Sequence, residues 1–249
     1  MEWIRRLAGK AVAPAPAAAS PGLRDETEAL IREVREARLT YCAVPKLQLL
    51  RDAALRVREE GVSGDFLEAG VALGGSAILL ARCKPATAGL GLYDVFATIP
   101  PPGLQDGEDA HERYAVIQSG QSQGIGGDVY YGYVDGLMDQ VRANLARFGV
   151  DEQRDKVRFV KGLFDDTLYP PGPVALAHID CDWYEPVRTC MSRIIPKLSP
   201  GGILVFDDYS SYSGCRRAVD ELLAERSDFE KIFERRSVGL RLRPGAARD

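Results

Sequence analysis

Short apolar segments alternate along the chain with longer stretches in which apolar residues recur every three or four positions. The short segments predict β-strands, and they span Asp65–Ala69, Gly89–Tyr93, Val157–Val160, Val174–Ile179 and Ile203–Phe206. The amphipathic stretches predict helices near Ser76–Cys83, Gly136–Phe148, Glu185–Leu198 and Cys215–Glu225. Regular alternation of this kind is typical of a parallel sheet covered by helices on both faces.

Both ends of this pattern carry further elements. Residues 25–39 and 44–61 have apolar positions at helical spacing, so they predict two N-terminal helices, the second of which stops at Gly61. Residues 228–244 predict two strands around Ser237–Gly239, paired as an antiparallel hairpin at one edge of the sheet. The expected fold is therefore α/β, with a doubly wound, mostly parallel, seven-stranded sheet and an antiparallel C-terminal edge.

The chain length of 249 residues fits one α/β domain, which we expect over residues 24–245. Residues 1–23 read as a flexible Ala/Pro-rich arm, because prolines interrupt the apolar residues that a signal peptide needs, and residues 246–249 as a tail. Residues 96–133 are rich in Pro, Gly and Gln and too long for a simple connection. We expect this insertion to be a lid that shapes the acceptor pocket.

Charge and cysteine content narrow the class of partner. The net charge is −4 with both signs interspersed, which disfavours nucleic acid and anionic membrane surfaces as partners. No apolar run approaches the roughly 18 residues of a membrane helix. The five cysteines are scattered without a CxxC pair, which favours reduced thiols, a cytoplasmic location and no zinc site. A homo-oligomer is expected, and the N-terminal helices are the candidate contact with a second subunit.

A glycine-bearing turn follows the first predicted strand. Glu68, Gly70, Gly74 and Gly75 form E-x-G-x-x-x-G-G instead of the dinucleotide pattern G-x-G-x-x-G. The next strand ends in Asp94, where an acid typically accepts hydrogen bonds from ribose hydroxyls. Glu68 suits a ligand with an ammonium group, so S-adenosylmethionine is favoured over NAD; a turn that binds nothing is the alternative.

Four aspartates follow two neighbouring predicted strands. Asp180 and Asp182 come after residues 174–179, and Asp207 and Asp208 come after residues 203–206. Because strand side chains alternate between faces, Asp180 and Asp182 are expected to point the same way. Carboxylates gathered this closely repel unless they are protonated or bridged by a cation, and hard oxygen ligands suit Mg²⁺ or another divalent cation. The alternative is that Asp182 caps the helix that follows it.

Other polar residues near these motifs have ordinary structural explanations. His178 is expected to be a strand residue that faces the helix layer, and His111 is expected to be exposed in the insertion. Tyr130, Tyr131 and Tyr133 are able to stack on a ring of the acceptor or to pack the insertion, and packing is favoured.

The motifs from Thr40 to Glu225 resemble the metal-dependent sugar O-methyltransferases of antibiotic biosynthesis, typified by the macrocin, mycinamicin and novobiocin enzymes, which are class I, Rossmann-like methyltransferases. The similar segments are "TYCAVPKL", "GVSGDFLEAGVALGG", "YDVF" and "VRFVKGLFDDTL". The resemblance implies S-adenosylmethionine contacts at Thr40, Tyr41, Glu68, Gly70, Val71, Gly74, Gly75, Ser76, Asp94, Gly162, Leu163, Phe164 and Asp180.

Two acidic segments, "LAHIDCDWYEP" and "PKLSPGGILVFDDY", also resemble this family. They imply that Asp180, Asp207 and Asp208 bind Mg²⁺ and that Asp182 is the general base. The implied acceptor is a sugar hydroxyl of a small-molecule glycoside. Residues 99–133 follow no family pattern, so the acceptor itself is not implied. A catechol-type diol, a nucleotide-binding oxidoreductase and an inactive binding module are the alternatives, the last disfavoured by the intact acids.

Overall fold

The computed structural model describes residues 21–245, and its centre is a seven-stranded sheet in the order β3-β2-β1-β4-β5-β7-β6. The strands are β1 (Asp65–Ala69), β2 (Leu90–Asp94), β3 (Val157–Lys161), β4 (Val174–Ile179), β5 (Leu198–Phe206), β6 (Phe229–Glu234) and β7 (Val238–Leu242). β1 to β5 pair in parallel, and β7 runs antiparallel to both β5 and β6. The predicted fold class is confirmed, with β5 starting earlier than expected.

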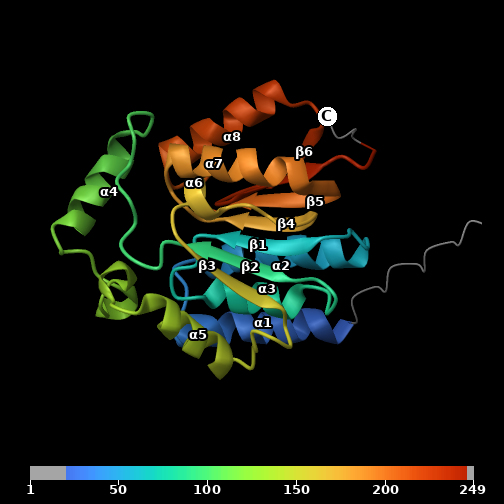
Figure 1. The fold of residues 1–249 in the computed structure, drawn as a ribbon, viewed down its shortest axis with the longest axis horizontal. Helices are drawn as coiled ribbons and strands as arrows, with labels where there is room; N and C mark the ends of the chain where they lie inside the picture. Colours follow the sequence, from blue (N-terminus) through green and yellow to red (C-terminus); the bar gives the residue numbers. More distant parts are fainter. Residues whose placement is uncertain (1–20, 246–249) are drawn as a thin grey trace, which may run out of the picture.

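Helices cover both faces of the sheet (Figure 1). One layer holds α1 (Pro21–Glu36), α2 (Val44–Glu59), α3 (Gly75–Cys83) and α5 (Leu137–Arg147), and the other holds α6 (Phe164–Thr167), α7 (Tyr184–Ile194) and α8 (Ser213–Glu225). α1 begins at Pro21, so the last residues of the expected arm are helical. The rest of that arm, residues 1–20, and the expected tail, 246–249, lie outside the described residues.

Alternation along the strands divides the core into two layers. Phe66, Leu176 and Val205 pack with α1, α2, α3 and α5, whereas Leu67 and Ala177 pack with α7 and α8. Strands buried on both faces read as continuous apolar runs, which explains why the sequence pattern was clear. The polar residues inside these strands are therefore the exceptions that need a function.

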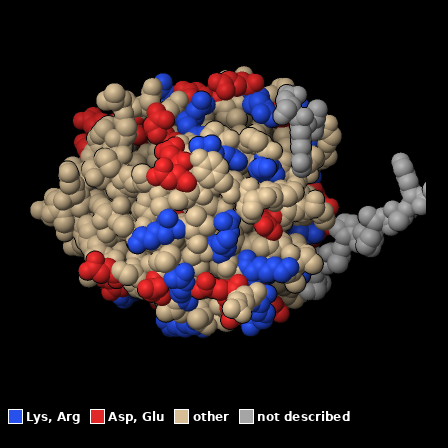
Figure 2. All heavy atoms as spheres, viewed as in Figure 1, with Lys and Arg blue, Asp and Glu red and all other residues tan. Residues whose placement is uncertain are grey.

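The outer surface shows no segregation of charge on the face drawn in Figure 2, where Lys and Arg are interspersed with Asp and Glu. In the part of the chain from 21 to 245, no helix combines the length and apolar character needed to cross a membrane.

The insertion at residues 96–133 holds α4 (Glu108–Gln118) and the short 3₁₀ turns η1 (Ile125–Gly127) and η2 (Tyr131–Tyr133). Two of its aspartates bind the N-termini of helices in the main body. Asp106 Oδ1 accepts a hydrogen bond from the Tyr184 backbone N–H at 2.7 Å, and Asp109 accepts hydrogen bonds from the Ser213 N–H and hydroxyl, both at 2.7 Å. These are the first residues of α7 and α8, whose N–H groups lack partners within their own helices. The insertion is thus fastened to both helices.

Replacing Asp106 by alanine is expected to lower the free energy of unfolding by about 1 kcal/mol, because the buried carboxylate caps α7. Chemical denaturation measures this change. The control is Glu108→Ala, an exposed acid in the same segment, which should stay within about 0.5 kcal/mol of the native protein. Equal stabilities of the two variants would contradict the capping role of Asp106.

Candidate active site

Two cavities meet at the carboxyl ends of the parallel strands, next to the point where strand order reverses between β1 and β4. The first, which we call the carboxylate cavity, measures about 270 Å³ and is lined by Asp180, Asp182, Asp207 and Asp208 together with Lys46, Arg113, Tyr130 and Tyr212. The second, the apolar cavity, measures about 230 Å³ and is lined by Ile99, Pro100, Leu163 and Phe164, among others. Gly70, Asp94, Tyr131, Asp180 and Asp182 line both.

The turn after β1 is organised by Asp94. Its Oδ2 accepts hydrogen bonds from the backbone N–H groups of Val71 at 2.6 Å and Ala72 at 3.2 Å, and its Oδ1 accepts one from Phe96 at 2.7 Å. Burial raises the pKa of Asp94, and these three N–H groups oppose that effect. Asp94 therefore shapes the turn, and its contact with a ribose stays a prediction.

Glycine is required at the start of this turn. Gly70 has φ of 90°, and a Cβ there would lie 1.8 Å from the Asp180 carbonyl oxygen. This close approach brings the end of β1 against the end of β4, where the acidic residues begin. At the other end of the turn, the Gly75 N–H donates to the Leu39 carbonyl at 2.8 Å, which joins the turn to the segment that precedes α2.

The residues predicted to bind the cofactor divide into two groups. Those that line a cavity are Tyr41, Gly70, Asp94, Leu163, Phe164 and Asp180. Those that line neither cavity are Thr40, Glu68, Val71, Gly74, Gly75, Ser76 and Gly162. Two residues of the second group contact residues that line a cavity: Thr40 Oγ1 accepts a hydrogen bond from the Cys42 N–H at 3.1 Å, and the Val71 N–H donates to Asp94 at 2.6 Å.

Three of the four predicted acids converge. Oxygens of Asp180, Asp182 and Asp208 lie within 4.8 Å of one another. Burial raises the pKa of all three carboxyls, and the negative charge of neighbouring carboxylates adds to the effect. Hard oxygen donors in this number fit Mg²⁺, which is usually held by a few carboxylates and keeps other positions open.

Strand alternation is not the reason for this convergence. β4 ends at Ile179, before either acid, and Asp182 has φ of 60°. Left-handed backbone is uncommon for residues other than glycine, and aspartate is among those that tolerate it. The Asp182 N–H also donates to Asp208 Oδ2 at 3.4 Å. Asp180 and Asp182 therefore face the same site, as expected, but a bend in the backbone brings them there and not the alternation of a strand.

The helix-capping alternative for Asp182 is wrong. The N-cap position of α7 is Trp183, which makes no capping hydrogen bond, and the Tyr184 N–H is taken by Asp106 from the insertion. The Asp182 carboxyl is therefore left facing both cavities.

The fourth acid, Asp207, is engaged elsewhere. Lys46 Nζ donates to its Oδ2 at 2.6 Å, Ser237 Oγ donates to its Oδ1 at 3.3 Å, and His178 Nε2 lies 3.9 Å from the same Oδ1. Although burial opposes the change, His178 and Lys46 hold the pKa of Asp207 below its ordinary value. The structure thus groups Asp182, and not Asp207, with Asp180 and Asp208; the metal role of Asp207 stays a prediction.

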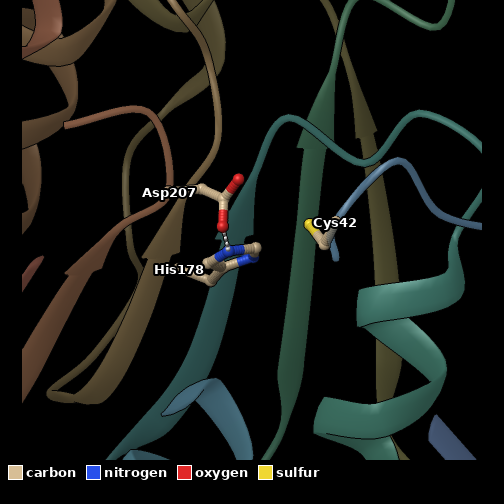
Figure 3. A group of neighbouring side chains, drawn as sticks. All are labelled: Cys42, His178 and Asp207. Carbon is tan, nitrogen blue, oxygen red and sulfur yellow. Dashed lines mark ion pairs between the residues drawn. The ribbon is translucent and has the colours of Figure 1, made fainter. Parts of the chain in front are cut away.

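His178 connects the cofactor turn to this acid. It shares a face of β4 with Leu176, which packs against the layer of α1 to α3, so its side chain lies on the face covered by those helices, as expected. Its Nδ1 is 2.8 Å from Glu68 Oε1. Figure 3 shows its ring beneath Asp207, with the sulfur of Cys42 turned toward it. Burial opposes protonation, but Asp207 and Glu68 raise the pKa of His178 to about 10. Atoms of Cys42, His178 and Asp207 come within 4.8 Å, yet Glu68 and Lys46 already pair with two of them.

Glu68 itself is fully buried, and its Oε2 has no hydrogen-bond partner among residues 21–245. A buried polar atom of this kind is costly to leave unpaired. Its predicted contact with the cofactor is therefore retained as a prediction.

Sequence reasoning missed two basic residues of the carboxylate cavity. Lys46 belongs to the first turn of α2. The one feature of the sequence that could have indicated its role is a positive charge next to the apolar face of an amphipathic helix. Arg113 comes from α4 in the insertion, with its guanidinium carbon 5.4 Å from the centre of the Tyr130 ring. No sequence pattern indicated that α4 would reach this cavity.

The aromatic residues of the insertion pack on one another, as favoured from the sequence. Ring centres of Tyr130 and Tyr131 are 4.5 Å apart, and those of Tyr130 and Tyr133 are 5.1 Å apart. Tyr130 and Tyr131 also form part of the wall of the carboxylate cavity. His111 is exposed, as expected.

Known proteins are similar to this chain in fold and in sequence. The O-methyltransferase NovP superposes with a TM-score of 0.70 at 25% identity, over 89% of this chain and 98% of that one. A curated relative from Streptomyces olivaceus, 8-demethyl-8-(2,3-dimethoxy-alpha-L-rhamnosyl)-tetracenomycin-C 4'-O-methyltransferase, is 31% identical over 84% of this chain and 76% of its own. Mycinamicin III 3''-O-methyltransferase from Micromonospora griseorubida is 30% identical over 83% and 81%, respectively. The protein is accordingly an S-adenosylmethionine-dependent O-methyltransferase.

The particular family follows from the match of residues 23–234 to the macrocin-O-methyltransferase (TylF) model. The chain belongs to this family, as the resemblance of its motifs implied. The alternatives of an oxidoreductase and of an inactive binding module are not supported.

Proposed function

We propose that the protein transfers the methyl group of S-adenosylmethionine to a sugar hydroxyl of a glycosylated, antibiotic-type natural product, with Mg²⁺ bound in the carboxylate cavity. The observation that carries this proposal is the convergence of Asp180, Asp182 and Asp208 beside a second, apolar cavity. The names of the relatives support the acceptor class, since both curated relatives above are methyltransferases of sugar-bearing antibiotics.

The residues present fit the two groups that this reaction needs. Leu163 and Phe164 in the apolar cavity suit an adenine ring, with Asp94 at its border for the ribose. Asp180 and Asp208 would hold Mg²⁺, joined by Asp207 if the family pattern applies. When bound, Mg²⁺ lowers the pKa of the acceptor hydroxyl, and S-adenosylmethionine supplies the methyl group.

The residues of the chain then position and deprotonate the acceptor. Asp182 lines both cavities, so it would be placed to accept the hydroxyl proton while the acceptor oxygen bonds to the methyl carbon and the cofactor sulfur leaves as a neutral thioether. Tyr130, Tyr131 and Tyr212 form an aromatic wall that excludes water from one side of the acceptor. Holding the reacting groups together removes much of the entropic barrier, and no covalent bond to the enzyme is needed.

The other expectations about partners and location are carried forward as proposals. A cavity of about 270 Å³ suits one sugar ring. The net charge of −4, with both signs interspersed on the face drawn in Figure 2, disfavours a nucleic-acid partner. All five cysteines are free and buried, in keeping with a reducing cytoplasm. A homo-oligomer is proposed, and light scattering of the purified protein tests it.

Calorimetric titration with S-adenosylmethionine, with NAD⁺ as the matched control and Mg²⁺ present, is expected to give binding of the former only. Methyl transfer is then compared for a panel of glycosides and catechols, since a catechol also offers neighbouring hydroxyls. We expect turnover with glycosides. Turnover of catechols alone would mean that the acceptor is a catechol and not a sugar, while the proposed roles of the carboxylates would remain.

A further inference from the structure

Among the ion pairs that a lysine or arginine makes within residues 21–245, the pair of Lys46 and Asp207 is the most buried. Their side chains are 12% and 6% exposed, and Lys46 Nζ donates both to Asp207 Oδ2 at 2.6 Å and to the Asp207 carbonyl oxygen at 2.9 Å. Both residues line the cavity, together with the three converging carboxylates. Breaking a buried pair without replacing the cation is strongly unfavourable, so this contact holds Asp207 in place.

We propose that Lys46 competes with the divalent cation for Asp207, so that Asp207 becomes a metal ligand only when the ammonium group withdraws. This inference rests on the proposed function, because it concerns the cation that the proposed reaction uses.

The distribution of hydrogen bonds around Asp207 carries the argument. Lys46 occupies Oδ2, while Ser237 donates to Oδ1 and His178 faces it. A divalent cation that binds Oδ2 at the usual distance of roughly 2.0–2.1 Å would lie next to the ammonium group that donates to the same oxygen at 2.6 Å, and the two positive charges repel. Lys46 is the group with the means to leave, because its ammonium is a point charge on a flexible four-carbon stem that borders the open cavity.

The other three acids have no cationic side chain in direct contact within residues 21–245. Asp180, Asp182 and Asp208 make no ion pair with a lysine or arginine in the described residues. A cation therefore binds first at Asp180 and Asp208, with Asp182 beside them. When Asp207 becomes a further ligand, the divalent cation replaces the Lys46 ammonium as its positively charged partner. Lys46 therefore influences the affinity for Mg²⁺ at this step.

Titration of Mg²⁺ into the native protein and into Lys46→Gln tests this competition. If the pair is closed for about nine-tenths of the time, its removal should tighten Mg²⁺ binding about 10-fold, because only the open fraction is competent. Arg113→Gln is the matched control, since it removes one positive charge from the same cavity and breaks no ion pair within residues 21–245. We expect that control to tighten binding less than about 3-fold.

If Lys46→Gln binds Mg²⁺ no more tightly than the native protein does, the competition is wrong and the proposed function still stands. The same holds if Arg113→Gln tightens Mg²⁺ binding as much as Lys46→Gln does. Absence of Mg²⁺ binding to every variant would overturn both. A crystal structure of the native protein with Mn²⁺ covers the case in which Lys46→Gln does not fold. Asp207 bound to the metal with Lys46 Nζ beyond hydrogen-bond distance supports the competition, and an intact Lys46–Asp207 pair contradicts it.

Discussion

Asp182→Asn is expected to lower kcat by roughly 10²–10⁴-fold while S-adenosylmethionine and Mg²⁺ still bind. The amide has nearly the shape of the carboxyl but cannot take a proton from the acceptor hydroxyl. The backbone at this position, with φ of 60°, should persist because asparagine tolerates the left-handed region as well as aspartate does. Single-turnover kinetics at saturating S-adenosylmethionine measures the change.

The control for this variant is Asp139→Asn, on an aspartate of α5 whose side chain is 79% exposed and lines neither cavity. It should leave kcat unchanged. Raising the Mg²⁺ concentration separates two roles for Asp182, because a loss due to weakened metal binding is recovered and a loss of the base is not. Turnover close to that of the native protein would remove Asp182 from the reaction.

Local patterns are sufficient for the centre of the sheet, because β1, β2, β4 and β5 are buried along almost their whole length and their apolar runs are visible without knowledge of their neighbours. The edge strand β3 is partly exposed, yet its alternating apolar residues still predict a strand. Local patterns are also sufficient to bring the acids to one edge, since the carboxyl ends of parallel strands meet there. The insertion was harder to interpret. Its Pro and Gly content hid α4, whose few apolar positions do not form a strong helical pattern.

The pairing of the acids could not be read from the sequence. Asp207 is held by Lys46, which is 161 positions away, and the start of α7 is capped by Asp106 from 78 positions away. Neither contact has a local signature, because a lysine on a helix and an aspartate in a loop are ordinary surface residues in most sequences. The sequence alone therefore does not exclude Asp182 as the cap of α7, whereas the structure does, because Asp106 binds the Tyr184 N–H.

Strand register explains why the sequence indicates separate roles for Glu68 and His178. Both lie in buried strands, and the register of β1 against β4 places them directly opposite each other. That register is a property of the sheet and not of either strand, so a pair of this kind emerges only when the strands are aligned.

Removal of the divalent cation with EDTA is expected to reduce methyl transfer by at least about 100-fold, since the cation contributes several kcal/mol by stabilising the ionised hydroxyl. Mg²⁺ should restore the native protein but not Asp208→Asn, which keeps an oxygen for the Asp182 N–H and loses the charge of the cluster. S-adenosylmethionine binding, measured in EDTA, is the control that the fold and the apolar cavity survive.

Full activity in EDTA would mean that Asp180, Asp182 and Asp208 do not gather around a metal. Burial raises the pKa of these carboxyls, so the cluster would then hold protons in place of a cation, and Asp182 could not serve as the base without another source of positive charge.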